Sequence, residues 1–527
     1  MKIQIKEFIS KINSIPKLKS IILIIIIGLS TFSNLKSQKP VPGQIWVTPI
    51  KDLNLIPVKL KVPQKFRSFI DTNRILYLPQ GWTAQVFCIG GFSKPRFMEW
   101  SPDSVLHISD LNTGNIYAMP DKNHDGIADT VYPVVTGVGA NNLQFFDGRI
   151  YAANTTTVYR CEDLDNNGIF ETKTKIISSL PSIGHSTRTL LIRPETQKLY
   201  VSIGSGCNVC RDLNRDDIEE YNLDGTGRKI YISGARNAIG MAIQPSTGKL
   251  WADNNGSDNQ GNDIPPEWFD IVREGGFYGF PVAFGYQSYF NYSLGTDYQA
   301  LLPITKQDSD LIKTMVNPAA LIQAHSAPMQ LTFSNNSMPS EFQNGAFMAL
   351  RGSWNRRPYT GYKYIYLHFA NPGDTVVEWV ADFMRGFLTD SINGVYWGRP
   401  VGVAMDNNGA LYFGSDDSMR MVVKVWMEKP TKVGDFNSND NSSFTLLPNP
   451  ATDNLNINCK NKLTNDFKNQ IIIYDPQGNR IKNITFPQND GSLDNYQINI
   501  KDLSTGVYYL SLISNNSIIT KSFCVIK

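Results

Sequence analysis

The 527-residue sequence lacks both a strong net charge and a long apolar run. Its formal net charge is +3 at pH 7, and residues 1–37 contribute six lysines against one glutamate. The remaining residues therefore carry a net charge of −2, which gives no electrostatic basis for binding nucleic acid or an anionic membrane. The apolar run from Ile21 to Leu29 is too short to cross a bilayer as a helix.

The N-terminus has the pattern of an export signal. Lysines precede the apolar run, and small residues surround Ser37-Gln38. This pattern predicts a secretory signal peptide over residues 1–37, followed by a lead-in segment over residues 38–74 and no transmembrane segment in the mature chain. A signal anchor is the alternative. No cysteine lies near the expected cleavage site, so lipid anchoring is not indicated.

Cysteine is scarce, with six in the chain, and only Cys207 and Cys210 are close in sequence. No second C-x-x-C pair supports a zinc site. Arg211 follows Cys210 where a covalent haem attachment site has histidine. Because thiols of an exported protein can be oxidised, we expect a structural disulfide between Cys207 and Cys210.

Long helical periodicity is also absent. Short alternating runs end in Gly, Asn or Asp, which predicts an all-β chain. One run recurs six times, and its central apolar residues are Leu106, Ile150, Leu199, Leu250, Phe347 and Leu411. The first spacings, 44, 49 and 51 residues, suit one four-stranded sheet per repeat, and the later ones require insertions. We therefore expect a six-bladed β-propeller over residues 75–430, with an array of β-sandwiches as the alternative.

A polar linker, residues 431–443, and a separate module, residues 444–527, follow the repeats. Alternating runs with Gly turns predict a small β-sandwich. Its three motifs are Leu-Pro-Asn-Pro at 447–450, Tyr-Asp-Pro-Gln-Gly at 474–478 and Leu-Ser-Thr-Gly at 503–506. In this order they resemble the C-terminal sorting domain of the type IX secretion system. The resemblance implies export by that machinery, into the medium or onto the cell surface. A carbohydrate-binding β-sandwich is the alternative.

Two acidic loops, offset by 42 residues, alternate oxygen-bearing side chains and end in glycine. Their candidate ligands are Asp121, Asn123, Asp125 and Asp129 in the first loop and Asp163, Asp165, Asn167 and Glu171 in the second. Such hard oxygen donors suit calcium, but the bidentate glutamate expected at position twelve is missing. Asx turns explain the same residues without a metal. Both interpretations stay open.

Eight motifs between residues 75 and 430 occur in the order found in one enzyme family. They are residues 78–82 (Leu-Pro-Gln-Gly-Trp), 184–185 (Gly-His), 207–210 (Cys-Asn-Val-Cys), 236–237 (Arg-Asn), 275–281 (Gly-Gly-Phe-Tyr-Gly-Phe-Pro), 325–328 (His-Ser-Ala-Pro), 352–356 (Gly-Ser-Trp-Asn-Arg) and 398–402 (Gly-Arg-Pro-Val-Gly). The ordered set resembles the soluble sugar dehydrogenases that depend on pyrroloquinoline quinone (PQQ), and especially their glucose/sorbosone dehydrogenase relatives.

The resemblance implies that the protein oxidises an aldose or a related sugar by hydride transfer to PQQ. His185 matches the family's base, and histidine suits proton transfer near neutral pH. It also precedes a strand, where a loop on the top face of a propeller is expected. His325 is the second candidate. Because no haem motif is present, electrons are expected to leave to an external acceptor.

The resemblance also assigns the cofactor ligands. Arg236 and Arg399 match the family's arginines, and Asn237 matches the neighbouring amide. Arg351 and Arg356 are weaker candidates. Guanidinium groups bind carboxylates as bidentate forks, which suits the three carboxylates of PQQ.

Calcium, the family's cation, would be held by backbone carbonyl groups at Gly256 and Ser257 and would polarise the quinone. Ser257 departs from the proline of some members. Two other function classes stay open, a calcium-dependent propeller lactonase and a non-catalytic propeller that binds glycans, because a propeller fold alone does not decide function.

Overall fold

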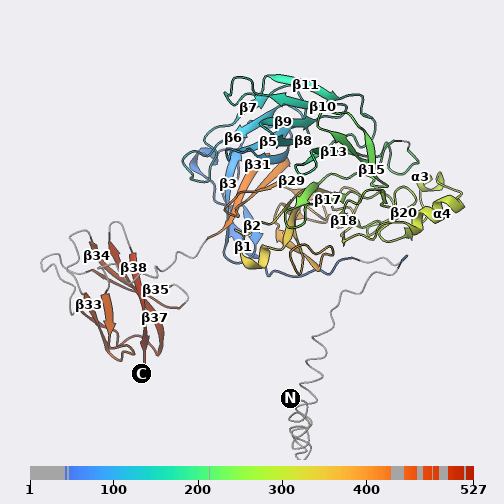
Figure 1. The fold of residues 1–527 in the computed structure, drawn as a ribbon. Coiled ribbons are helices and arrows are strands. Elements are labelled where there is room, and N and C mark those ends of the chain that lie inside the picture. Colours follow the sequence, from blue (N-terminus) through green and yellow to red (C-terminus); the bar gives the residue numbers. More distant parts are fainter. Residues whose placement is uncertain are drawn as a thin grey trace, which may run out of the picture. The chain divides into compact units, whose positions relative to one another are not determined.

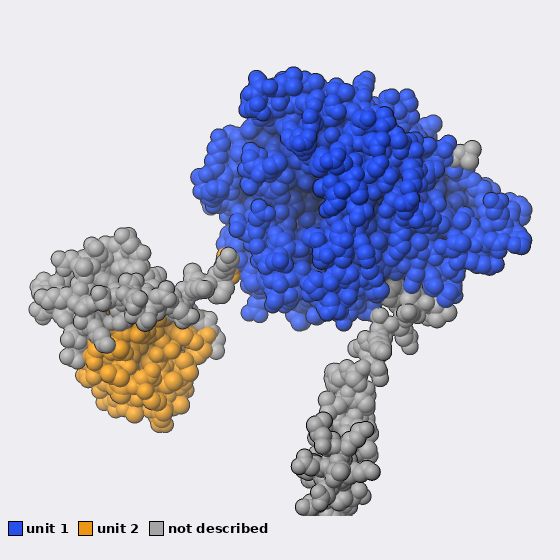
Figure 2. All heavy atoms as spheres, in the orientation of Figure 1, with its two compact units in different colours: residues 1–427 blue, residues 428–527 orange. Residues whose placement is uncertain are grey.

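The computed structural model describes residues 42–43, 47–212, 214–428, 444–459, 467–476, 479–485, 496–514 and 518–527. The predicted signal peptide, the start of the lead-in and the predicted linker lie outside the described residues. The chain divides into two compact units, residues 1–427 and 428–527 (Figure 2). Nearly all of their regular secondary structure is β-strand (Figure 1), which confirms the predicted all-β class.

In the described residues of unit 1, six sheets have four or five strands, and three of these sheets consist of four consecutive strands of the chain. Sheet 1 consists of β4 (Pro95–Trp100), β5 (Leu106–Asp110), β6 (Ile116–Met119) and β7 (Tyr132–Val135). Sheet 2 consists of β8 (Asn142–Phe146), β9 (Arg149–Ala153), β10 (Val158–Glu162) and β11 (Thr172–Ile177). Sheet 3 consists of β12 (Leu190–Arg193), β13 (Lys198–Ile203), β14 (Asp217–Asn222), β15 (Lys229–Ser233) and the parallel β19 (Gly276–Phe277).

The last sheet of unit 1 is completed from the other end of the unit. Sheet 4 consists of β16 (Met241–Gln244), β17 (Lys249–Asn254), β18 (Glu267–Ile271) and β22 (Ala320–Ile322). Sheet 5 consists of β23 (Pro328–Phe333), β24 (Gly345–Leu350), β25 (Lys363–His368) and β26 (Trp379–Met384). Sheet 6 consists of β29 (Gly398–Met405), β30 (Leu411–Ser418), β31 (Met421–Met427) and β3 (Trp82–Ile89).

Each of the six repeated runs forms the second strand of its own sheet, and the sheets close into a ring. The first strands contact one another in the cycle β4, β8, β12, β16, β23, β29 and back to β4. The blue β3 lies beside the orange β29 and β31 in Figure 1, and β3 pairs with β31 from Trp82–Met427 to Ile89–Met421. Hydrogen bonds between the two ends of the unit therefore hold the cycle closed.

The remaining elements of unit 1 are short. The insertion between β18 and β22 contains β20 (Ala283–Phe284), β21 (Ser288–Tyr289), α3 (Thr296–Gln299) and α4 (Lys306–Lys313). It accounts for the wide spacing between the fourth and fifth repeats. The other short elements are β1 (Ile56–Lys59), η1 (Gln64–Phe66), β2 (Ile75–Leu78), η2 (Ser340–Phe342), β27 (Leu388–Asp390) and β28 (Val395–Tyr396).

Apolar side chains that alternate between the two faces of each second strand pack neighbouring sheets against one another. In β13, Leu199 and Val201 join an apolar cluster with sheet 2, whereas Tyr200 joins a cluster with sheet 4. Successive side chains of a strand point to opposite faces, so each strand supplies both neighbouring interfaces. The core is therefore divided among the interfaces between sheets, and the loops at the strand ends remain available for a site.

The described residues of unit 2 form two antiparallel sheets. One consists of β32 (Phe444–Leu447), β33 (Asn454–Cys459) and β36 (Tyr496–Asn499). The other consists of β34 (Phe467–Tyr474), β35 (Arg480–Thr485), β37 (Gly506–Ser514) and β38 (Ile518–Val525). Leu455 of the first and Ile471 and Leu510 of the second are fully buried in one apolar cluster. Unit 2 thus has a core of its own.

We expect Trp82→Ala to destabilise unit 1 strongly. Trp82 is 3% exposed on β3, and its ring packs edge-on against Phe342 and Phe383. Removing so large a buried side chain costs about 3–5 kcal/mol in the free energy of unfolding. Urea unfolding followed by circular dichroism measures this loss. Ile392→Ala, at a side chain 66% exposed, is the control and should change stability by less than about 0.5 kcal/mol. Equal stability of the two variants would contradict the role of β3.

Candidate functional site

Loops from several sheets surround one cavity of about 410 Å³. Because the first strands form a closed cycle, the loops that follow or precede them meet around a common opening. Seven residues singled out in the sequence line the cavity: His185, Arg236, Asn237, Gly256, His325, Arg351 and Arg399. They come from five different sheets or from the loops that join them, so the ring closure brings together residues up to about two hundred positions apart.

His185 lies in the loop before β12, and its ring is held from one side. Its Nδ1 is 3.0 Å from both the carbonyl oxygen and the hydroxyl oxygen of Ser205. A carbonyl oxygen only accepts, so Nδ1 carries the proton and donates, which leaves the lone pair on Nε2. The Ser205 hydroxyl donates to the Cys207 carbonyl oxygen at 2.8 Å. Burial, assisted by the Arg236 charge, lowers the pKa of His185 to about 4. At neutral pH the imidazole is therefore an unprotonated potential base.

Arg236, in the loop between β15 and β16, is buried and fully engaged. Its Nε and Nη2 donate to the backbone and side-chain oxygens of Asn208 at 2.9 and 3.1 Å. Its Nη1 donates to the Gly256 carbonyl oxygen at 2.6 Å. Asn208 lies between Cys207 and Cys210, which form the predicted disulfide. The disulfide loop thus fixes the guanidinium group.

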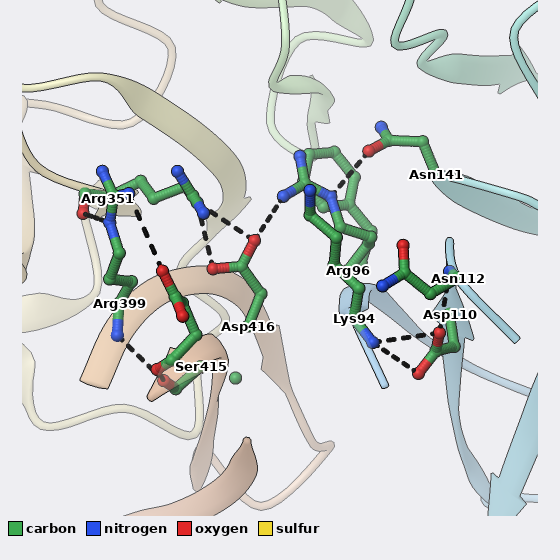
Figure 3. A network of polar contacts seen from close by, with 12 residues as sticks. Lys94, Arg96, Asp110, Asn112, Asn141, Arg351, Arg399, Ser415 and Asp416 are labelled. Atoms are coloured by element: carbon green, nitrogen blue, oxygen red, sulfur yellow. Dashed lines mark hydrogen bonds and ion pairs between the residues drawn. The ribbon is translucent and has the colours of Figure 1, made fainter. Parts of the chain in front are cut away.

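Two further arginines bind one buried carboxylate, that of Asp416 on β30, and a third, Arg399, binds the backbone beside them (Figure 3). Arg96 of β4 donates from Nη1 to Asp416 Oδ2 at 2.6 Å, and Arg351 donates from Nε to both oxygens at 3.0 Å. Arg399 donates to the carbonyl oxygens of Arg351 and Gly352 at 3.2 and 2.8 Å. This side of the cavity is therefore a network that joins sheets 1, 5 and 6.

Two acids face the cavity near Gly256. Glu267 is buried, accepts the Gly256 amide proton, and has its pKa raised by burial to about 8. Asp258 accepts from Asn355 Nδ2 at 2.6 Å and lies 3.5 Å from Arg236 Nη2. Burial raises the pKa of Asp258, and Arg236 opposes that shift. The Gly256 carbonyl and these carboxyl groups form a cluster of hard oxygen donors.

Other predicted ligands lie elsewhere. Arg356 is not among the residues that line the cavity, and its guanidinium group donates to Asn262 and Asp263. Ser257 is buried, does not line the cavity, and has its hydroxyl oxygen 2.8 Å from that of Tyr298. The second histidine candidate, His325, is held by its Nε2, 2.9 Å from the Gly261 carbonyl oxygen.

The two acidic loops form matching turns that do not line the cavity. The amides of Asp125 and Gly126 donate to Asp121, and the amides of Asn167 and Gly168 donate to Asp163. Asx turns of this kind use the carboxylates without a metal. In the second loop the carboxylate oxygens of Asp163, Asp165 and Glu171 also lie within 4.8 Å of one another. Calcium at these loops stays a prediction.

The cavity suits an anionic ligand with several hydrogen-bonding groups. Its cationic lining residues are Lys94, Arg96, Arg236, Arg351 and Arg399, whereas its acidic ones are Asp258 and Glu267. The buried side-chain oxygens of Asn237 and Asn355 have no hydrogen-bond partner among the described residues, and both residues line the cavity. Buried polar atoms without partners are rare and point to a missing ligand or water. The cationic side chains suit a ligand that carries carboxylates, whereas the two amide oxygens, which only accept, require a hydrogen-bond donor or a cation.

Sequence reasoning missed several of these residues. Lys94 and Arg96 flank Pro95 just before the first repeated strand, and no known pattern marks them. Asp416 offered a signal, because an aspartate at the end of an apolar run must find a buried partner. Ser205 precedes the Cys207–Cys210 segment and Asn208 lies within it, but the sequence pattern indicates only a structural disulfide there.

Comparisons with known proteins agree with the two units. Residues 76–425 match a family model described as TrAA12-like. Residues 445–527 match the secretion system C-terminal sorting domain, which confirms the predicted module. The protein is thus exported by the type IX secretion system to the surface or the medium. In the described part of the chain, no helix is long and apolar enough to span a bilayer.

Three relatives resemble the chain. An uncharacterized protein of Borreliella burgdorferi is 26% identical over 368 residues, 67% of this chain and 91% of the relative. Quinoprotein glucose dehydrogenase B of Acinetobacter calcoaceticus is 26% identical over 308 residues, 44% of this chain and 62% of the relative. A pyrroloquinoline quinone-dependent sugar dehydrogenase of Hypocrea jecorina is 22% identical over 341 residues, 56% of this chain and 75% of the relative.

Two solved structures show the same fold. An iodide structure of the Trichoderma reesei carbohydrate-active enzyme family AA12 aligns with a TM-score of 0.56 at 20% identity, over 67% of this chain and 97% of that one. The holo form of the PQQ domain of pyranose dehydrogenase from Coprinopsis cinerea aligns with a TM-score of 0.55 at 19% identity, over 69% of this chain and 98% of that one.

We expect histidine NMR to place the pKa of His185 near 4. Arg236→Gln should raise this pKa because it removes a nearby positive charge, but the value should stay below the ordinary 6.5, since burial is the larger cause. The His185→Gln spectrum assigns the signal. Arg356→Gln, which changes a guanidinium group outside the cavity, is the control and should leave the pKa unchanged. A wild-type pKa near 6.5 would contradict the desolvated setting of the imidazole.

Proposed function

We propose that this protein, which belongs to the TrAA12-like family, is an exported oxidoreductase that uses PQQ to oxidise an aldose or a related sugar. The predicted resemblance to PQQ-dependent sugar dehydrogenases is confirmed at the level of the family. The observation that carries the proposal is the meeting of an unprotonated imidazole and several guanidinium groups in one cavity. No single sheet supplies them all.

We propose that the six sheets of the closed cycle are the blades of a six-bladed β-propeller that spans residues 75–430. The cycle of first-strand contacts and the pairing of β3 with β31 support this interpretation. We likewise propose the two sheets of residues 444–527 as a β-sandwich, supported by their shared core. A propeller sets its loops around a central opening, which suits a cofactor that needs ligands from several directions.

In the proposed reaction, Nε2 of His185 takes the proton from the hydroxyl group on the anomeric carbon of the sugar. A hydride leaves the same carbon, and a carbonyl group forms, so that an aldose in its ring form becomes a lactone. PQQ, when bound, would supply the acceptor for this hydride and pass the electrons to an external acceptor. The hydrogen bond from Nδ1 to Ser205 keeps the lone pair of Nε2 free for this step.

The arginines that line the cavity would hold the carboxylates of PQQ. Arg351 and Arg399 present guanidinium groups from sheets 5 and 6, while Arg236, in the loop after β15, would have to give up one of its present protein contacts to bind the cofactor. Asn237, whose side-chain oxygen lacks a partner, would add a hydrogen bond through the same amide group. Arg356 would contribute only by moving from its present contacts.

We propose that calcium binds beside the Gly256 and Ser257 backbone. The Gly256 carbonyl, the Asp258 carboxylate and the Glu267 carboxyl group offer the hard oxygen donors that calcium prefers. A cation there would expel the proton from Glu267, whose pKa is raised to about 8. The same charge would compete with Arg236 for the Gly256 carbonyl oxygen.

The two rival functions fit the cavity less well. A calcium-dependent lactonase would bind its metal through side-chain carboxylates that converge on the axis, but five cationic and only two acidic side chains line this cavity. A propeller that only binds glycans has no need for a desolvated imidazole. Turnover of lactones without PQQ would favour the lactonase. Unchanged ligand binding after replacement of His185, together with no turnover by the wild type, would favour the glycan-binding propeller.

We expect purified protein to bind PQQ with micromolar affinity or better in the presence of calcium, measured by the absorbance of the bound quinone. A panel of sugars should then reduce a dye. His185→Gln should lower kcat about 10²–10⁴-fold, because the general base is lost, while PQQ binding stays within a factor of about three. His107→Gln, at a buried histidine of β5 outside the cavity, is the control. No PQQ binding by the wild type would refute the function.

Calcium removal should weaken cofactor binding. Chelation of calcium before addition of PQQ should raise the Kd at least about tenfold, because the cation offsets part of the charge of the bound carboxylates. Glu267→Gln should reduce the affinity of the protein for calcium. Asp163→Asn, in the second acidic loop, should leave PQQ binding unchanged. A Kd for PQQ that does not depend on calcium would remove the proposed cation from the site.

A further inference from the structure

We infer that Lys94 is a carboxylate-binding residue of the cavity, the free member of a cationic wall that consists of Lys94, Arg96, Arg351 and Arg399. This inference rests on the proposed function, because it adds a ligand to the same site. Lys94 and Arg96 come from the start of sheet 1, while Arg351 and Arg399 come from sheets 5 and 6 (Figure 3). All four residues line the cavity.

The cationic wall keeps hydrogen-bond donors free, in contrast with Arg236. All three nitrogens of the Arg236 guanidinium group donate to protein oxygens. Among the described residues, no acceptor lies within hydrogen-bond or ion-pair distance of Lys94 Nζ, and Arg351 uses only its Nε. A lysine that is partly buried without a hydrogen-bonded partner loses solvation, which the charges of Asp416 and Asp417 offset only in part. Its free ammonium group is therefore poised for a ligand.

Hydrogen bonds fix the backbone at Lys94. Asp110 is fully buried, and its carboxylate accepts the amide protons of Ser93, Lys94, Asn112 and Thr113. Figure 3 shows Asp110 beside Lys94 and next to Asn112, with both carboxylate oxygens joined to the Lys94 backbone. The next residue is Pro95, whose ring fixes one backbone dihedral. The start of β4 is thus held in one position, which directs Lys94 to the cavity.

The excess positive charge of the cationic wall also favours binding of an anion. One carboxylate, Asp416, serves two guanidinium groups, and the carboxylate of Asp417 lies 4.0 Å from Arg399 Nη1. Apart from the Asp110 carboxylate, which accepts from backbone amides, four cations therefore face two carboxylates. Burial lowers the pKa of Lys94, and the charges of Arg96 and Arg351 add to this shift. A bound carboxylate would relieve this repulsion and accept from Lys94 at the same time.

Two ligands could bring this carboxylate: the cofactor, or an acidic sugar such as a uronate. The first arm of the test titrates the full-length exported protein with PQQ and calcium, in the absence of sugar. Lys94→Gln should raise the Kd about tenfold or more, the value of one charge-assisted hydrogen bond. Lys94→Arg should stay within about threefold of the wild type. Lys249→Gln, at an exposed lysine outside the cavity, is the matched control.

The second arm measures galacturonate and galactose binding by calorimetry, without cofactor. If Lys94→Gln weakens PQQ binding, the carboxylate is that of the cofactor. If it weakens only galacturonate binding, the carboxylate belongs to an acidic sugar. Unchanged binding of both overturns the inference and leaves the proposed function intact. If the wild type binds no PQQ, the proposed function fails, and the inference about Lys94 is tested by galacturonate binding alone. Weaker binding of galacturonate by Lys94→Gln than by the wild type then supports the inference, and equal binding overturns it.

Discussion

The pairing of β3 with β31 is the interaction on which the rest of unit 1 depends. It joins the first long strand of the unit to its last sheet, and this closes the cycle of first-strand contacts. Only in a closed cycle does sheet 1 meet sheet 6, so that Arg96 reaches Asp416 across 320 positions of the chain. The cationic side of the cavity is a direct product of that closure.

Charge compensation then sets the chemistry of the cavity. Arginines placed close together repel one another unless carboxylates and backbone carbonyls accept from them, and here both kinds of acceptor are used. His185 lies in the same positive surroundings and is desolvated, which keeps its imidazole unprotonated. The positive surroundings that favour an anion in the cavity thus contribute, after burial, to keeping this imidazole neutral.

The repeated run at Leu106 and its five counterparts was enough to predict the all-β class and one sheet per repeat, because alternation and spacing are local signals. His185, Arg236 and Arg399 were found through motifs that keep their order in the chain. Lys94, Glu267 and Asp416 were not, since their roles arise from contacts between sheets. A charged residue in a single sequence carries no record of the distant side chain that it faces. The insertion after β18 was expected, but its short helices were not.

The Cys207–Cys210 disulfide has a consequence for when the protein becomes competent. The bond closes the loop that carries Asn208, and Asn208 supplies two of the oxygens that hold Arg236. Thiols stay reduced in the cytoplasm and pair once the chain reaches an oxidising compartment. A newly made chain would thus keep an unfinished, loosely braced pocket until it has left the cytoplasm. The Cys207–Cys210 bond thus couples completion of the pocket to export.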